Sequence, residues 1–89
     1  MMTYCLKSST IFIADEKILI DTEKKAIRKY NESACIILAH LEDGPLSLDE
    51  IGTRMCDEKG IQQLCSDDIA AFVAYLLESG LIVSLERVD

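Results

Sequence analysis

The clearest pattern of hydrophobic positions lies near the C-terminus, between Ser66 and Ser79. Its apolar residues recur at i, i+3, i+4, i+7 and i+8, the spacing of one buried stripe on an amphipathic helix. They are Ile69, Phe72, Val73, Leu76 and Leu77. Ser66 is a suitable N-cap, and Gly80 can take the left-handed conformation that ends a helix. We therefore predict a helix over residues 66–79, followed by a strand or extended return over residues 81–85.

Two shorter helical patterns precede this one. The first follows Asn31, a good N-cap, and repeats apolar residues at helical spacing until Gly44. The second begins with a capping box, in which Ser47 is followed three residues later by Glu50. Gly52 lies inside this second helix, where glycine costs about 1 kcal/mol relative to alanine. We therefore expect another backbone to pack closely against Gly52.

The N-terminal third alternates β-forming runs with polar turns, which is typical of hairpins. Strands are predicted over residues 10–14, 18–20 and 26–30, and the third, being the least apolar, is expected at an edge. Residues 3–6 fit a further short strand, and residues 57–65 fit a loop. The order of elements predicts a single α+β domain, winged helix-turn-helix-like, with a three-stranded N-terminal antiparallel sheet packed on a three-helix bundle and a short C-terminal extended segment.

Composition and charge narrow the class of partner. The 89 residues include 9 Lys and Arg against 16 Asp and Glu, so the net charge of -7 repels a nucleic-acid backbone on average. A signal-peptide pattern is missing, and no apolar run approaches the roughly 20 residues that span a bilayer. We expect a cytoplasmic protein that binds neither nucleic acid nor membrane.

Cysteine and histidine are the candidate catalytic or metal-ligating residues. Cys5, Cys35, Cys56 and Cys65 form no CxxC pair, so we predict free, partly buried thiols, with a reactive thiol or an improvised metal site as the alternative. His40 is the single histidine, and no serine, cysteine or carboxylate stands at a spacing typical of a triad. Phosphate-binding and metalloenzyme motifs are missing too. The sequence predicts no catalytic residue, no metal, no cofactor and no enzymatic activity.

Four short motifs, taken in order, resemble the PqqD family. They are Tyr30-Asn31 before the first helix, Leu41-Glu-Asp-Gly44 at its end, Ser47-Leu-Asp-Glu-Ile51 in the second helix, and Asp68-Ile-x-x-Phe72-x-x-x-Leu76-x-x-x-Gly80-Leu81 in the third. Each motif alone is common in helical domains, whereas their order and spacing over about residues 10–85 carry the resemblance. The chain departs from the family at Tyr30, where leucine is usual, and at Arg28 and Lys29 in the strand before it.

The resemblance implies a free-standing recognition element for ribosomally synthesised, post-translationally modified peptides (RiPPs), as in lasso-peptide or radical-SAM peptide pathways. Such a protein binds the leader of a precursor peptide and presents it to a leader peptidase, a cyclase or a radical-SAM modifying enzyme. In the family the leader adds as an extra strand to the third strand of the sheet, against the third helix. This mode is β-augmentation, in which main-chain hydrogen bonds give affinity and neighbouring pockets select side chains.

The resemblance also places the peptide-binding residues. The strand supplies Lys25, Ala26, Ile27, Arg28, Lys29 and Tyr30, and the helix supplies Asp68, Ala71, Phe72, Tyr75, Leu76 and Ser79. Tyr75 alternatively covers the sheet as part of the core. The basic cluster from Lys24 to Lys29 either discourages aggregation at the strand edge or attracts acidic leader residues.

Two other functions compete with leader binding. A winged helix-turn-helix regulator would need Arg, Lys, Asn or Gln on its recognition helix to reach base edges, and residues 66–79 contain none of these. An accessory or adaptor that contacts other proteins alone differs from a leader binder by its partner, which the sequence does not name. The sequence therefore favours the leader binder.

Overall fold

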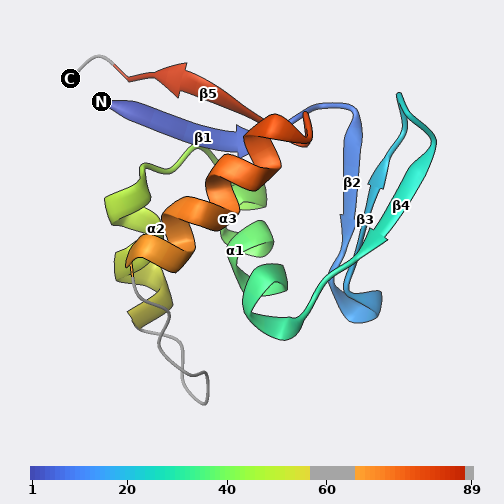
Figure 1. Ribbon diagram of the computed structural model, residues 1–89, viewed down its shortest axis with the longest axis horizontal. Helices are drawn as coiled ribbons and strands as arrows, with labels where there is room; N and C mark the ends of the chain where they lie inside the picture. Colours follow the sequence, from blue (N-terminus) through green and yellow to red (C-terminus); the bar gives the residue numbers. More distant parts are fainter. Residues whose placement is uncertain (57–65, 88–89) are drawn as a thin grey trace.

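The computed structural model describes residues 1–56 and 66–87, with the side chains of Cys56 and Ser66 left out (Figure 1). The predicted loop over residues 57–65 lies outside the described residues. Within them the chain forms β1 (Met2–Leu6), β2 (Thr10–Ile13), the 3-10 turn η1 (Ala14–Glu16), β3 (Ile18–Asp21), β4 (Ala26–Lys29), α1 (Glu32–Asp43), α2 (Leu48–Cys56), α3 (Ser66–Glu78) and β5 (Ile82–Glu86).

The strands form two antiparallel sheets. One is three-stranded in the order β2-β3-β4, as predicted, and the other pairs β1 with β5. The expectation of a single three-stranded sheet is therefore wrong, whereas the strand or extended return predicted after α3 is the strand β5. The extended segment after α3 finds a partner in the chain's own N-terminal strand, with Tyr4 opposite Ser84. The α+β class and the three helices are confirmed, whereas the winged helix-turn-helix layout is not.

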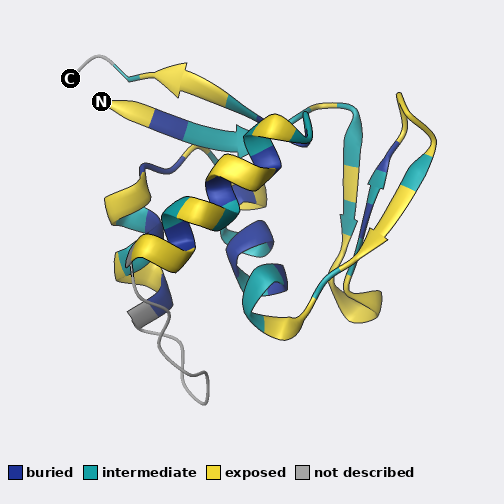
Figure 2. Ribbon diagram, viewed as in Figure 1, coloured by how far each residue is buried: buried dark blue, intermediate teal, exposed yellow. Residues whose placement is uncertain are grey.

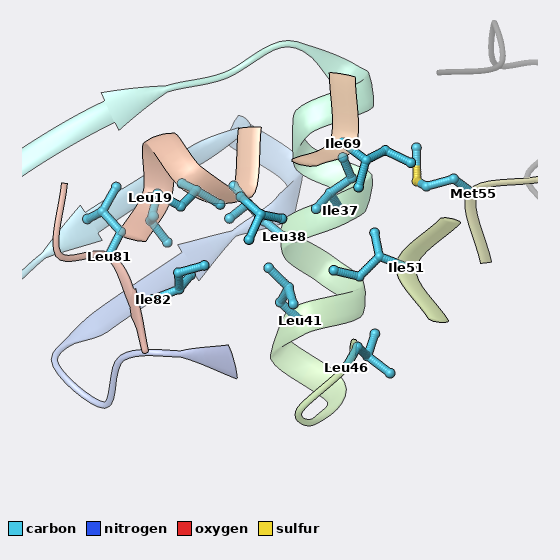
Figure 3. Close-up of a cluster of buried hydrophobic side chains, with 12 residues drawn as sticks. Leu19, Ile37, Leu38, Leu41, Leu46, Ile51, Met55, Ile69, Leu81 and Ile82 are labelled. Atoms are coloured by element: carbon cyan, nitrogen blue, oxygen red, sulfur yellow. The ribbon is translucent and has the colours of Figure 1, made fainter. Parts of the chain in front are cut away.

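The hydrophobic core lies among the three helices and is closed by Leu19 of the three-stranded sheet and Ile82 of β5 (Figure 3). Leu38 of α1, Ile51 of α2 and Leu76 of α3 are each 0% exposed, and Leu19 of β3 is 1% exposed. Burying one such side chain contributes about 1.5–3 kcal/mol. The helical periods read from the sequence therefore point toward one shared core.

The helix ends are fixed by the predicted residues. Asn31 caps α1, because its Oδ1 accepts a hydrogen bond from the Ala34 N–H at 2.9 Å. At the end of α3, Gly80 has φ 72° and its N–H donates to the Leu77 carbonyl. The Leu81 N–H donates to the Leu76 carbonyl, which completes a Schellman motif and turns the chain into β5. The predicted cap at Ser66 involves a side chain outside the described set.

The capping box of α2 is confirmed, but the expectation about Gly52 is wrong. The Ser47 N–H donates to Glu50 Oε1 at 3.0 Å, and the Glu50 N–H donates to Ser47 Oγ at 3.2 Å. The hydrogen bond from the Ser47 N–H and, second in size, the one from the Arg87 side chain lower the pKa of Glu50 below its usual value. Apart from the helix itself, no atom of the described residues lies within 4 Å of where a Cβ at Gly52 would stand. In this part of the chain no other backbone approaches Gly52, so packing does not offset the low helix propensity of glycine.

The β3–β4 turn is built by a buried carboxylate. Asp21 is 4% exposed, and its Oδ1 accepts hydrogen bonds from the N–H groups of Glu23 and Lys24. Lys25 follows in the left-handed region with φ 53°. Lys25 therefore belongs to the turn and not to the strand, which begins at Ala26.

Candidate functional site

Strand β4 is an edge of the three-stranded sheet. It pairs with β3 on one side, and none of the strands in the described chain pairs with its other side. The Tyr30 N–H donates to the Lys17 carbonyl, and in an antiparallel pair this direction recurs at every second residue. The backbone groups of Ile27 and Lys29 therefore point away from β3. They offer a short ladder of donors and acceptors to an incoming strand.

Helix α3 lies beside this edge and runs in the opposite direction. Lys24 Nζ donates a hydrogen bond to the Ser79 carbonyl at 2.9 Å, near the end of α3. One turn earlier on the helix, Arg28 Nη1 donates to the Tyr75 hydroxyl at 3.1 Å. Side-chain bridges thus join two elements that the sequence predicted to flank one groove.

Phe72 and Tyr75 of α3, together with Tyr30 just after β4, form an aromatic wall on the side of α3 that faces β4. The rings of Tyr30 and Phe72 meet edge to face with centroids 6.0 Å apart, and the Phe72 and Tyr75 rings stack at 6.2 Å. Tyr75 is 39% exposed, so it does not simply cover the sheet as core. Ala71 is exposed at the outer rim of the wall. Leu76 is 0% exposed and belongs to the core beneath it, so it is not on the surface that a ligand would touch.

A hollow of about 160 Å³ lies at the Tyr30 end of this wall, between the N-terminal turns of α1 and α3. It is lined by Asn31, Ser33, Ala34, Ile37, Asp68 and Phe72. Asp68 and Phe72 were predicted site residues, whereas the four residues around α1 were not. Sequence reasoning missed them because they already had structural roles in the predicted helix: Asn31 as its N-cap, and Ala34 and Ile37 in its buried stripe.

The two phenols of the wall perturb each other. Burial raises the pKa of Tyr30 well above its usual value, and the neighbouring Tyr75 adds to the shift. The pKa of Tyr75 is lowered, first by the Tyr30 hydroxyl and then by the Arg28 guanidinium. Of the two phenols, Tyr75 is therefore the one that releases its proton more readily. The wall presents the Tyr30 and Tyr75 hydroxyls beside the Arg28 guanidinium, and the Asp68 carboxylate lies in the lining of the hollow at its end.

Charge is distributed unevenly over the molecule. Residues 7–30 contain six Lys or Arg and four Asp or Glu, which gives them a net charge of +2 and leaves -9 for the rest. In the predicted basic cluster, Lys24 and Arg28 are engaged in the bridges to α3. Lys25 and Lys29 are exposed and form no ion pair with the described residues. The open strand edge is thus a basic region on an acidic protein.

The other candidate residues lie apart from this edge. Cys5 is half-buried in β1, and Cys35 is a buried free thiol in α1 whose pKa is raised by burial. Cys65 and the side chain of Cys56 lie outside the described residues. His40 is half-buried on α1. Among the described residues, no three His, Cys, Asp or Glu side chains gather as a metal site would require.

A membrane-spanning segment would need a long apolar helix. In residues 1–56 and 66–87, none of the helices has the length and hydropathy to cross a bilayer.

Comparison with known proteins was made at the level of structure and of sequence. One solved structure, described as lasso peptide synthetase B1 complexed with the leader peptide, matches with a TM-score of 0.70. The match covers 90% of this chain and 96% of that chain at 23% sequence identity, which shows a shared fold. Among curated proteins, nothing matches. The family model described as Coenzyme PQQ synthesis protein D (PqqD) matches residues 16–82. This chain therefore belongs to the PqqD family.

Proposed function

We propose that this protein binds the leader region of a ribosomally synthesised precursor peptide by strand addition to β4. The observation that carries the proposal is an open strand edge lying beside an aromatic helix wall, with the backbones of Ile27 and Lys29 turned outward. Membership of the PqqD family supports it. So does the shared fold with a protein described as complexed with a leader peptide.

The direction of the bound leader follows from the alignment of β4 with α3. The contacts Lys24 to Ser79 and Arg28 to Tyr75 show that the strand and the helix run antiparallel. A leader antiparallel to β4 consequently runs parallel to α3. It enters beside the hollow near Phe72 and leaves near the β3–β4 turn.

Side chains of the leader alternate between two sides of the extended sheet. Those on the helix side meet the aromatic wall, and the first of them lies opposite Tyr30, next to the hollow. An apolar anchor suits the Ala34, Ile37 and Phe72 surfaces there. The bridge from Arg28 to Tyr75 crosses the groove, so we expect it to rearrange as the leader enters.

Presentation of the leader, and not chemistry, is the role that we assign to the protein. The groove brings together phenols, a guanidinium and apolar surfaces, which bind and orient a peptide. A leader peptidase, a cyclase or a radical-SAM enzyme would act on the precursor that this protein holds. Pairing of five or six residues plus two anchors gives an affinity of about 8–10 kcal/mol after the ordering of the peptide is subtracted.

The test compares two alanines on α3 that differ in position. Both are exposed, but helical spacing puts Ala71 next to Tyr75 at the rim of the wall and Ala74 farther round the helix from Tyr75 and Phe72. The probe is a fluorescently labelled leader peptide, to be taken from a short precursor gene sought next to the gene of this protein. Ala71→Trp should weaken its binding by about 2 kcal/mol or more, because the indole fills the space of an anchor. Ala74→Trp should bind like the parent.

Circular dichroism confirms beforehand that both variants fold. Equal affinity of Ala71→Trp and the parent would place the peptide elsewhere and refute this site. Absence of binding by the parent itself at 50 µM leader, roughly fortyfold above the weak end of the expected range, would refute the function.

A further inference from the structure

The face of the three-stranded sheet that points away from the helices is made of isoleucines. Strand alternation and register put five of them together on this outer isoleucine face. They are Ile11, Ile13, Ile18, Ile20 and Ile27. The members on the outer strands β2 and β4 are exposed, Ile27 to 67% and Ile11 to 51%, and those on the central strand β3 are half-buried. Apolar residues gathered in this way on a soluble surface mark an interaction site more often than single exposed ones do.

One row of this face ends at the open edge of β4. Ile11, Ile20 and Ile27 stand opposite one another across the three strands. A strand added to β4 places its own side chain next to Ile27 on the same face, because directly opposed residues of an antiparallel pair share a face. The row continues into whatever strand is bound there.

The neighbouring row carries a charge at the same edge. Ile13 and Ile18 are followed across the strands by Lys29, which is exposed and makes no ion pair with the described residues. Residues 27 and 29 are the two whose backbone groups face the incoming strand. The side chains of Ile27 and Lys29 therefore lie next to the side chains of the two leader residues whose backbones pair with them.

We propose that side chains of the leader are recognised on both faces of the extended sheet, and that Ile27 and Lys29 recognise those on the outer face. Ile27 selects an aliphatic residue, and Lys29 selects an acidic residue two positions closer to the N-terminus of the leader. This proposal rests on the proposed function, since it names the sequence class that the same edge accepts. The occupant of the outer row is the leader itself, because the row is continuous with the binding edge and the lysine is complementary to a carboxylate.

The experiment begins with a phage-displayed library of random twelve-residue peptides selected on the folded protein. Enriched peptides are synthesised, labelled and titrated against the parent, Ile27→Thr, Ile11→Thr and Lys29→Glu. Threonine keeps the β-branch of isoleucine and removes apolar surface. Ile11 lies in the same row on the far strand, so Ile11→Thr is the matched control.

We expect the enriched peptides to share an acidic residue followed two positions later by an aliphatic one. Ile27→Thr should weaken their binding about three- to fivefold, the size of one cross-strand pair, and Ile11→Thr by less than 1.5-fold. Lys29→Glu should weaken binding by about two- to fivefold. Replacing the acidic peptide residue by lysine should restore binding to Lys29→Glu and not to the parent.

Equal effects of Ile27→Thr and Ile11→Thr, or failure of the charge exchange, would overturn the inference. In that case a loss of binding with Ala71→Trp would still leave the leader-binding function standing. Enriched peptides that bind Ala71→Trp as tightly as the parent would instead refute the site itself. A dimer in sedimentation equilibrium that is abolished by Ile11→Thr would show that a second copy of the chain covers this face, which would also overturn the inference.

Discussion

The core-facing apolar residues of α1 and α3 are closed off from solvent, whereas isoleucines on the outer face of the three-stranded sheet remain accessible. Leu38 and Leu76 are 0% exposed, while Ile27 is 67% exposed. Figure 2 shows the same contrast between the buried stripes of the helices and the exposed strand β4. The two regions differ in charge as well, because residues 7–30 carry a net +2 and the rest of the chain carries -9. The comparison separates the apolar residues that hold the fold together from those that are available to a partner.

The largest expected effect lies in the closed region. Leu38→Ala removes a side chain surrounded by core residues, so unfolding should become easier by about 2–5 kcal/mol. Chemical denaturation of the variant measures this change. Ile27→Ala, an equally apolar truncation in the open region, should shift the free energy of unfolding by less than about 1 kcal/mol. Similar losses of stability for the two variants would show that the outer isoleucines hold the fold together as the core residues do.

Strand addition at the open edge depends on backbone donors. Ile27→Pro removes an N–H that points away from β3, so it should weaken leader binding tenfold or more without removing a β3–β4 hydrogen bond. Fluorescence polarisation with the labelled leader measures the affinity, after circular dichroism has verified the fold. Binding as tight as that of the parent would show that the peptide does not pair with β4.

A change in the capping box should lower stability and leave leader binding unaffected. Ser47→Ala removes the hydroxyl that accepts the Glu50 N–H, and it should lower the free energy of unfolding by about 1 kcal/mol. Leader affinity should stay within twofold of the parent, because α2 does not border β4. Thermal denaturation and a parallel titration check both halves of this expectation.

Charge at the edge should act mainly on association. The double variant Arg28→Glu, Lys29→Glu should weaken binding of an acidic leader by less than about 1 kcal/mol in 0.02 M salt. The difference should shrink in 0.5 M salt if these cations act by long-range attraction. A loss that does not change with salt would indicate a direct contact of these cations with the leader, as inferred above for Lys29.

The smallest effect concerns the alkaline range. Because the folded state raises the pKa of Tyr30, it favours the neutral phenol, and the corresponding stability is present below the unfolded pKa of about 10. That stability is lost as the pH rises above 10. Tyr30→Phe should therefore change stability little at pH 7 and lose less than the parent between pH 9.5 and 11. Urea denaturation across this range measures both, and parallel curves would contradict the assignment.

The sequence predicted the helices well because each one combines a period with its own end signals. Asn31, Ser47 and Gly80 act locally, so their roles follow from neighbours a few residues away. Long-range pairing was harder to foresee. Nothing in residues 81–85 indicates that β1, some 80 residues earlier, is the partner of β5.

The same difference between local and long-range signals applies to the candidate site. Tyr75 and Phe72 share a helix face at local spacing, so the aromatic wall could be expected. The hollow requires the first turns of two helices to meet, and Asn31 and Ala34 already had structural explanations. Leu76 was placed in the groove because one helical period cannot separate a groove wall from the core directly beneath it.

Met1 and Arg87, the first and last described residues, lie side by side, on the part of the molecule away from the three-stranded sheet (Figure 1). The α-amino group of Met1 contacts both Glu86 Oε1 and the Arg87 carbonyl. Anything tethered through either terminus, such as a sensor surface, a reporter or a second copy of the domain, would therefore start from one corner and leave β4 facing outward. Copies arrayed in this way would keep every strand edge available for capture, which makes the fold suited to multivalent display.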